Sequence, residues 1–213
     1  MILSHKHKFI FFSFPKTGSE SVRALLKEFN EADVRVYKEI DEKNPFYSHI
    51  SPIETLSIFN SNGWDYSDYY KFMIVRNPWK RLVSLYEMIY NHGVKKLFRP
   101  SFNNWLQTID NKGQGGGGKD YMRWRKYGTY SLPYYAMRKG DLLVDKVIKL
   151  ENIDSGIREI FDKLEIELSQ EVPKINRRKK TKESYKFYYN NDSIERVYKL
   201  YEYEIEHFKY TFD

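Results

Sequence analysis

The stretch KFIFFSFPKTGSESVRALL, residues 8–26, sets the fold class of this chain. It opens with an apolar run that ends at Pro15, a pattern typical of a strand buried on both faces of a parallel sheet. Apolar side chains then recur at the three- and four-residue spacing of one helical face over residues 22–29, and Ser19 or Ser21 is placed to cap that helix. The stretch therefore predicts a buried strand, a tight turn and an amphipathic helix.

Two later stretches repeat this order of strand and helix. Residues 70–75 (YKFMIV) form an apolar run, after which Asn77 is placed to cap a helix with Pro78 at its first position. Residues 146–150 (KVIKL) lead into a third helix, whose buried face is expected over residues 153–164. Strands that alternate with helices predict an α/β fold with a central parallel sheet flanked by helices.

Two more helices are expected outside these units. Ser51 and Glu54 have the spacing of a capping box, and Asp192 with Glu195 is placed to cap a closing helix over residues 193–208. Between the second and third strands, about residues 111–130, a run of four glycines predicts a mobile surface loop, because glycine loses the most conformational freedom on ordering.

The length of 213 residues suits a single domain, and we expect one domain over residues 1–213. The chain has no cysteine, so it offers neither a disulfide framework nor a thiolate metal site, and we see no cluster of metal ligands. The apolar run of residues 9–14 is too short for a signal or membrane segment. We therefore expect a cytoplasmic protein with no membrane partner and no metal.

The turn at residues 15–21 (PKTGSES) has the composition of an anion site. Backbone N–H groups at a helix start, a glycine that permits close approach, hydroxyl groups and Lys16 together suit the oxygens of phosphate or sulfate. The net charge of +7 also favours an anionic partner. The other interpretation is an ordinary capped turn with a surface lysine. An ATP-type P-loop is not expected, because Lys16 precedes Gly18 and the earlier glycine of that motif is missing.

A second candidate site covers residues 76–84 (RNPWKRLVS), again where a strand ends and a helix begins. Arg76 has the planar donor fork that suits phosphate, and Ser84 adds a hydroxyl two turns into the helix. Taken singly, both residues are also compatible with an ordinary surface role. They indicate an anion site only when they are considered together with the turn at residues 15–21.

Together the two motifs resemble those of the sulfotransferases that use PAPS (3′-phosphoadenosine 5′-phosphosulfate). Residues 15–19 look like the family's 5′-phosphosulfate loop, and residues 76–84 look like its 3′-phosphate motif, in the expected order. Similarity to the carbohydrate-type branch, which includes the uronyl and heparan-sulfate 2-O-sulfotransferases, extends through residues 47–49, 149–152 and 201–212. The resemblance covers most of the chain and implies a phosphate-binding strand, loop and helix.

The resemblance also implies a binding role for each motif. The first loop would hold the 5′-phosphate and the sulfuryl group, and the second motif the 3′-phosphate, with the two strand-to-helix junctions side by side. Basic residues before the last helix add a candidate clamp on the nucleotide. The expected nucleotide-binding residues are Lys16, Thr17, Gly18, Ser19, Glu20, Ser21, Arg76, Ser84, Arg177 and Arg178.

Glu20 departs from the family pattern, in which a small hydroxyl residue is common at this position. A carboxylate directed into an anion site would repel the donor. We therefore expect the Glu20 side chain to turn outward, where it still complements the positive end of the helix.

An in-line sulfuryl transfer needs charge stabilisation on the leaving oxygen and a base for the acceptor hydroxyl. The ammonium of Lys16 suits the first role, because the bridging oxygen gains negative charge as the S–O bond breaks. For the second role we expect His49, which precedes the Ser51 capping box and lies where the resemblance places a catalytic histidine. Glu54 and Glu87 are the alternative bases.

The expected acceptor is a hydroxyl-bearing glycan or small molecule, and adenosine 3′,5′-bisphosphate is the other product. Aromatic and basic side chains around the glycine-rich stretch suit a sugar ring or an acidic glycan. The same side chains are equally typical of core aromatics beside a solvated charged face. They are Trp105, Arg123, Trp124, Arg125, Lys126, Tyr127, Tyr130, Tyr134 and Tyr135.

Two other functional classes stay open at this point. The net charge, the aromatic content of 17% and the basic run at residues 177–180 also suit a nucleic-acid-binding module. Such a module would bind oligonucleotides with a steep salt dependence. A small-molecule kinase would instead need ATP and Mg²⁺. We expect the sulfotransferase, with no nucleic-acid partner.

Overall fold

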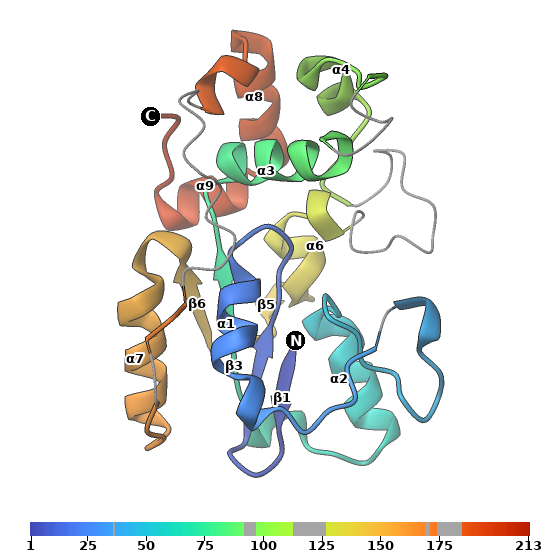
Figure 1. The fold of residues 1–213 in the computed structure, drawn as a ribbon, viewed down its shortest axis with the longest axis vertical. Helices are drawn as coiled ribbons and strands as arrows, with labels where there is room; N and C mark the ends of the chain where they lie inside the picture. The colour runs from blue at the N-terminus through green and yellow to red at the C-terminus, as the bar shows by residue number, and fades with distance from the viewer. Residues whose placement is uncertain (36, 92–96, 113–126, 169–170, 174–184) are drawn as a thin grey trace. The chain divides into compact units, whose positions relative to one another are not determined.

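The computed structural model describes residues 1–35, 37–91, 97–112, 127–168, 171–173 and 185–213 (Figure 1). The chain divides into two compact units. The first comprises Met1–Val75 and Tyr135–Arg177, and the second comprises Arg76–Tyr134 and Arg178–Asp213. The single domain expected from the sequence stays a prediction. Most of the expected glycine-rich loop lies outside the described residues.

The first unit is built on a four-stranded sheet in the order β1-β2-β3-β6 (Figure 1). Strands β2, β3 and β6 are parallel, with Phe11 opposite Phe72 and Met73 opposite Val147, whereas β1 pairs antiparallel with β2. The expected α/β fold with its central, mostly parallel sheet is confirmed. The edge strand β1 was not predicted, because three residues are too few to show a periodicity. The strands are β1 (Ile2–Ser4), β2 (Phe9–Phe12), β3 (Tyr70–Val75) and β6 (Lys146–Lys149).

One face of this sheet carries the core of the first unit. Side chains from alternate strand positions pack against two helices, α1 (Ser19–Leu25) and α7 (Ile153–Lys163). On the other face Ile10, Phe12 and Met73 are also fully buried, which is why the strands are apolar at consecutive positions. The core comprises Ile2, Phe9, Phe11, Val22, Leu25, Leu26, Phe72, Ile74, Ile148, Ile157, Ile160 and Phe161.

Helix α2 (Pro52–Ser61) begins with the predicted capping box. The backbone N–H of Glu54 donates to the Ser51 hydroxyl at 3.1 Å, and the Ser51 N–H donates to the Glu54 carboxylate at 3.2 Å. The other elements of this unit are short. They are η1 (Lys27–Phe29), η2 (Tyr37–Glu39), η3 (Tyr66–Asp68), the paired strands β4 (Met137–Arg138) and β5 (Asp141–Leu142), and η6 (Leu150–Asn152).

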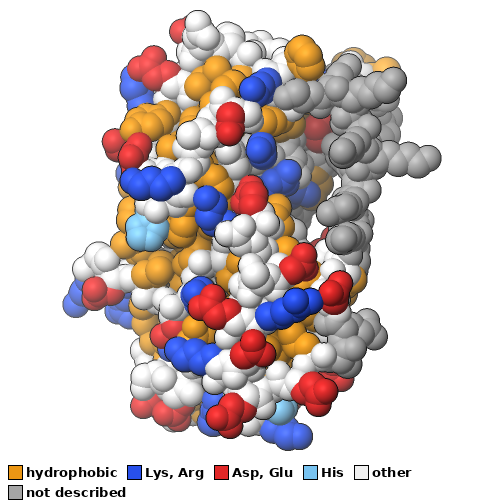
Figure 2. All heavy atoms as spheres, turned by 90° about the vertical axis from the view of Figure 1, so that its left-hand side faces the viewer, with side chains coloured by type: hydrophobic (Ala, Val, Ile, Leu, Met, Phe, Trp, Pro, Cys, Tyr) orange, Lys and Arg blue, Asp and Glu red, His pale blue; other side chains and the backbone are white. Residues whose placement is uncertain are grey.

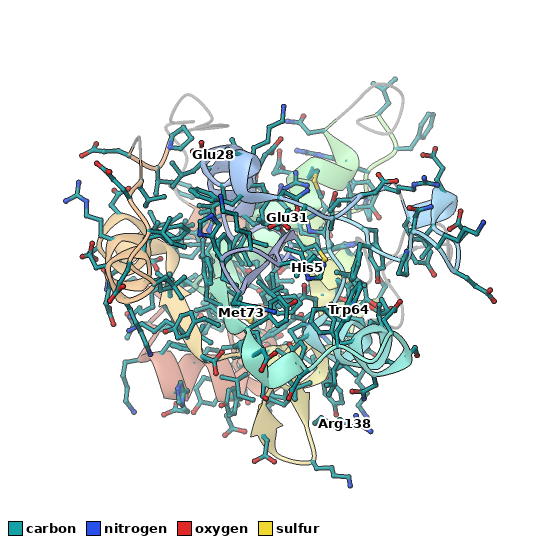
Figure 3. All side chains as sticks on the ribbon, turned by 90° about the horizontal axis from the view of Figure 1, so that it is seen from below. His5, Glu28, Glu31, Trp64, Met73 and Arg138 are labelled. Carbon is teal, nitrogen blue, oxygen red and sulfur yellow. The ribbon has the colours of Figure 1, made fainter. Side chains whose placement is uncertain are left out.

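Side chains close the amino edge of the sheet. The Lys71 ammonium is buried and donates to the carbonyl of Tyr69 at 2.6 Å and to the Asp145 carboxylate at 3.0 Å. His5 lies beside Trp64, with ring centroids 4.8 Å apart (Figure 3), and its Nδ1 is 2.6 Å from the Tyr69 hydroxyl. These contacts tie the amino ends of the strands together, and a pocket beside them is lined by Trp64, Lys71 and Asp145.

The second unit consists of helices and short turns. Asn77 caps its first helix as predicted, because its side chain accepts a hydrogen bond from the Lys80 N–H at 3.3 Å and Pro78 occupies the first helical position. The elements are α3 (Pro78–Tyr90), α4 (Phe102–Gln107), η7 (Tyr185–Tyr188), α8 (Asn191–Leu200) and α9 (Glu202–Phe208). A further short helix, α6 (Leu132–Ala136), crosses from this unit into the first.

The closing helix differs from the prediction in two ways. It begins earlier, because Asn190 and not Asp192 forms the cap, exchanging 2.9 Å hydrogen bonds with Ser193. It is also divided at Tyr201, where the backbone leaves helical geometry between α8 and α9. The asparagine amide supplies the same acceptor as an aspartate, so the cap motif alone did not fix the position of the start.

Three side chains of the second unit form hydrogen bonds with backbone groups of residues 129–132. The Tyr201 hydroxyl donates to the Thr129 carbonyl at 2.6 Å, Arg81 Nη2 donates to the Tyr130 carbonyl at 2.6 Å, and the Leu132 N–H donates to the Glu204 carboxylate. Buried backbone groups need such partners when no strand or helix supplies them. Burial raises the pKa of Glu204 to about 7, against the opposing charge of Arg81.

The substitution Glu204→Gln should isolate the contribution of this carboxyl to the pH dependence of stability. The folded carboxyl titrates near 7 and its ordinary pKa is 4.5, so ionising Glu204 makes folding less favourable as the pH rises through this window. The shift corresponds to about 3 kcal/mol. We expect the free energy of unfolding of Glu204→Gln, relative to wild type, to increase by about 3 kcal/mol between roughly pH 4.5 and pH 8, measured by urea denaturation.

Glu202→Gln is the matched control, because Glu202 lies on the same helix and is exposed. It should keep the wild-type dependence on pH. Equal behaviour of the two variants would show that the Glu204 carboxyl titrates normally.

Candidate functional site

The carboxyl edge of the sheet holds the predicted anion loop. Ser13 and the loop follow β2, and Leu150 follows β6 at the same edge because these strands are parallel to β3. Strand β3 ends at Val75, the last residue of the first unit in this part of the chain, and Arg76 begins the second. Ligands of open parallel sheets bind at the carboxyl ends of the strands.

The loop has an unusual backbone. Lys16 and Gly18 both have positive φ angles, 67° and 77°. Between them Thr17 is fully buried, and its hydroxyl donates to the carbonyl of Phe14 at 2.8 Å. A lysine in this conformation is strained by about 1–2 kcal/mol, which places Lys16 among the residues whose geometry is imposed by their surroundings.

The start of α1 also differs from the sequence-based expectation. Its N-cap is Gly18, which makes no side-chain capping bond, and neither Ser19 nor Ser21 acts as the cap. Ser19 is instead the first helical residue, because the left-handed glycine already turns the chain into the helix. Both serines are buried, Lys16 is half-buried, and Glu20 is exposed.

A side chain at position 18 would also crowd Leu150. A Cβ atom at this position would lie 2.7 Å from Cδ1 of Leu150, closer than real Cβ contacts. The loop after β2 and the turn after β6 therefore pack directly on each other. The sequence placed Leu150 in a family-like motif, but nothing in the pattern indicated this contact.

His49 is the second component of the site in this unit. Its Nδ1–H donates to the carbonyl of Ser13 at 2.7 Å, because a carbonyl oxygen only accepts. Nε2 then carries the lone pair of the neutral ring. Desolvation lowers the pKa of His49 to about 4, the Ser13 bond opposes this shift, and the positive charges of Arg23 and Lys16 add to it. The ring is therefore neutral at physiological pH and able to accept a proton.

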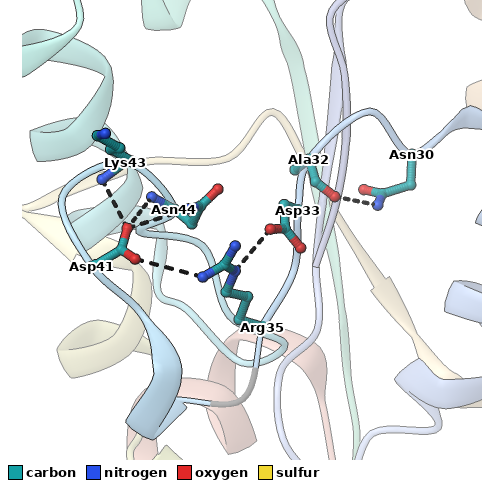
Figure 4. A network of polar contacts seen from close by, with 7 residues as sticks. All are labelled: Asn30, Ala32, Asp33, Arg35, Asp41, Lys43 and Asn44. Atoms are coloured by element: carbon teal, nitrogen blue, oxygen red, sulfur yellow. Dashed lines mark hydrogen bonds and ion pairs between the residues drawn. The ribbon is translucent and has the colours of Figure 1, made fainter.

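A polar network fixes the chain that leads to His49 (Figure 4). Arg35 pairs with Asp33 at 2.7 Å and with Asp41 at 3.5 Å, and the Asp41 carboxylate accepts the backbone N–H of Asn44 at 2.7 Å. The Arg35 N–H also donates to the Phe46 carbonyl at 3.0 Å. These contacts link residues that are distant along the segment between α1 and α2.

The alternative bases have structural partners. Glu54 accepts the Tyr47 hydroxyl at 2.6 Å in addition to its capping bonds. In the second unit Glu87 is buried and accepts the Tyr188 hydroxyl at 2.8 Å and a bond from Arg99 at 3.3 Å. Both carboxylates therefore have partners in the fold, as His49 has in Ser13, and the choice of base stays a prediction.

In the second unit, several contacts fix the amino end of α3, which carries the other motif. The Asn77 side chain donates to the Thr211 carbonyl at 2.9 Å, and Trp79 Nε1 donates to the Ile194 carbonyl at 3.2 Å. Arg76 and Ser84 are both half-buried. Arg81, within the motif, is fully buried and holds the backbone of Tyr130, a role the sequence did not indicate.

Some predicted site residues lie outside the described part of the chain. These are Arg177 and Arg178 of the clamp, and Arg123, Trp124, Arg125 and Lys126 of the aromatic stretch. Among its described members, Trp105, Tyr127 and Tyr135 are buried in the core, Tyr130 is half-buried, and Tyr134 is exposed. The core interpretation therefore holds for three of these aromatic residues.

Charges of both signs are interspersed on the face drawn in Figure 2. A nucleic-acid footprint needs basic residues gathered along one face, and this face of the described residues does not show that pattern. In the described ranges we find no group of three or more residues able to hold a metal ion, and no helix long and apolar enough to cross a membrane.

The model of the Sulfotransferase family matches residues 1–211, nearly the whole chain. No curated protein and no solved structure matches the chain.

Gly18→Ala should destabilise the loop through backbone strain and crowding together. We expect a loss of unfolding free energy of about 2–4 kcal/mol, the sum of a left-handed alanine and an overpacked contact with Leu150. Gly63→Ala is the control, because Gly63 has a similar φ of 68° and open space around its Cβ position. It should lose only about 1–2 kcal/mol. Equal losses in urea denaturation would show that the Leu150 contact is unimportant.

Proposed function

Because this chain belongs to the sulfotransferase family, we propose that it transfers the sulfuryl group of PAPS to a hydroxyl of a carbohydrate acceptor. One observation carries the proposal. His49 is bonded to the carbonyl of Ser13, three residues before the strained Lys16 of the anion loop, so a base and a cation share one edge of one sheet. The family match favours this function over the nucleic-acid module and the kinase that the sequence left open.

The donor roles follow the resemblance, residue by residue. The loop of residues 16–21 would hold the 5′-phosphate and the sulfuryl group, with Lys16 as the charged group and the buried hydroxyls of Thr17, Ser19 and Ser21 beside it. Exposure of Glu20 keeps its carboxylate in contact with solvent. In the second unit Arg76 and Ser84 would hold the 3′-phosphate, and Arg177 and Arg178 remain the proposed clamp.

The chemical step is an in-line displacement at sulfur. The acceptor oxygen forms a new O–S bond while the bond between sulfur and the 5′-phosphate oxygen breaks, and that electron pair stays on the phosphate. The acceptor proton passes to Nε2 of His49, which later releases it to water. The ammonium of Lys16 stabilises the charge that grows on the leaving oxygen, an interaction stronger in the transition state than in the bound substrate.

Burial is the largest cause of the low pKa of His49, and the positive charges of the amino terminus, Arg23 and Lys16 lower it further. A bound donor brings negative charge that opposes these positive charges. Donor binding should therefore raise the pKa of His49 and make it a stronger base in the complex. The acid limbs of kcat/KM for PAPS and of kcat should therefore lie at different pH values.

Lys16→Ala tests the role of the loop cation. Removing one group that stabilises the leaving oxygen should lower kcat by about 10²–10³. Lys27→Ala is the control, because Lys27 is exposed in the same unit. Turnover would be measured with sulfur-labelled PAPS, and titration calorimetry with adenosine 3′,5′-bisphosphate would measure binding. Wild-type turnover in Lys16→Ala removes this residue from the mechanism, and absence of nucleotide binding by the wild type removes the donor.

His49→Ala tests the base. Turnover should fall by about 10²–10⁴ while affinity for adenosine 3′,5′-bisphosphate is kept. In the wild type, the acid limb of kcat/KM for PAPS should lie near the pKa of His49 in the free enzyme, about 4. The acid limb of kcat should lie at higher pH. His207→Ala, at an exposed position, should behave as wild type. An active His49→Ala variant, or an acid limb unchanged by this substitution, contradicts the assignment.

The carbohydrate acceptor rests on the resemblance to the carbohydrate-type branch. A screen of glycans and small alcohols with sulfur-labelled PAPS tests it directly. A labelled glycan supports the proposal. Labelling of small alcohols alone would contradict a carbohydrate acceptor but would still support sulfuryl transfer from PAPS.

A further inference from the structure

Tyr135 contacts the segment that carries the proposed base. It is fully buried in the first unit, and its hydroxyl donates to the carbonyl of Ile50 at 2.9 Å. The same hydroxyl lies 3.4 Å from the carbonyl of His49. Tyr135 thus fixes the backbone at His49 and at the residue that follows it.

The ring of Tyr135 contacts the other component of the site. It packs on Phe14 with ring centroids 4.5 Å apart and planes inclined by 32°. Phe14 lies two residues before Lys16, and its carbonyl accepts the Thr17 hydroxyl. One rigid side chain therefore joins the anion loop to the His49 segment.

The position of Nε2 depends on two anchors. Nδ1 of His49 is held by the carbonyl of Ser13, and the backbone of His49 and Ile50 is held by Tyr135. Loss of either anchor leaves the imidazole free to pivot about the other. Misplacement of a reacting group by about 1 Å can cost 10²-fold in rate, so both anchors bear on turnover.

We propose that Tyr135 is a positioning residue, which sets the distance between the His49 base and the anion loop by binding the Ile50 carbonyl and packing on Phe14. The inference rests on the proposed role of His49 as the base. Tyr135 itself touches no reacting atom. It acts on catalysis through His49 and leaves the side chains of the anion loop in place.

Tyr135→Phe removes the hydroxyl and keeps the ring on Phe14. We expect kcat to fall between about tenfold and 10²-fold, with the Kd for adenosine 3′,5′-bisphosphate changed less than about twofold. Tyr66→Phe is the matched control, because the Tyr66 hydroxyl also donates to a carbonyl, that of Leu143, at 2.9 Å in the same unit. It lies at the amino edge of the sheet, so it should keep wild-type kcat.

A double variant distinguishes this proposal from a general loss of structure. In the His49→Ala background, Tyr135→Phe should lower kcat no further, because its effect passes through the base. Wild-type kcat in Tyr135→Phe, an equal loss in Tyr66→Phe, or an undiminished loss in the His49→Ala background each overturns the inference. If His49→Ala alone keeps full turnover, the base assignment fails independently of Tyr135.

Phe14→Leu tests the same link from the other side if Tyr135→Phe does not fold. It removes the ring contact and leaves the Tyr135 hydroxyl in place. It should lower kcat in the wild-type background and leave the residual rate of His49→Ala unchanged. Equal proportional losses in both backgrounds contradict the inference.

Discussion

The parallel pairing of β2 with β3 and of β3 with β6 is the constraint on which the site depends. Because these strands are buried on both faces, neither face of the sheet is open to a ligand. The candidate binding residues lie instead in the loops and helices that follow the strands. Parallel order brings the ends of β2 and β6 to one edge, where Gly18 packs on Leu150. At the opposite edge the Lys71 ammonium pairs with the Asp145 carboxylate, and His5 lies beside Trp64.

Lys16 and His49 lie more than thirty residues apart in sequence, yet both depend on the dipeptide Ser13-Phe14. The Ser13 carbonyl holds the imidazole, the Phe14 carbonyl holds Thr17, and the Phe14 ring packs on Tyr135. The end of β2 therefore organises the proposed cation and the proposed base together. Backbone carbonyls do this without adding charge, so the positive field is available to an anionic donor.

The sequence predicted those features that local patterns encode. The apolar runs of β2, β3 and β6, the capping box at Ser51 and the cap at Asn77 all follow from neighbouring residues. It did not predict β1, the cap at Gly18 or the break at Tyr201, because short elements and caps have several equivalent solutions within one stretch. The partners of Tyr135 and Arg81 are distant in sequence, so no local pattern could reveal them.

His49 and Glu204, whose pKa values burial shifts in opposite directions, have opposite effects on the proton balance of folding. His49 resists protonation in the native state, so folding releases a proton between about pH 4 and 6.5, whereas Glu204 resists ionisation, so folding takes one up between pH 4.5 and about 7. Over the shared range the two exchanges nearly cancel. Both side chains therefore stay neutral in the folded protein through the mildly acidic range, and their contributions to the pH dependence of stability offset each other there.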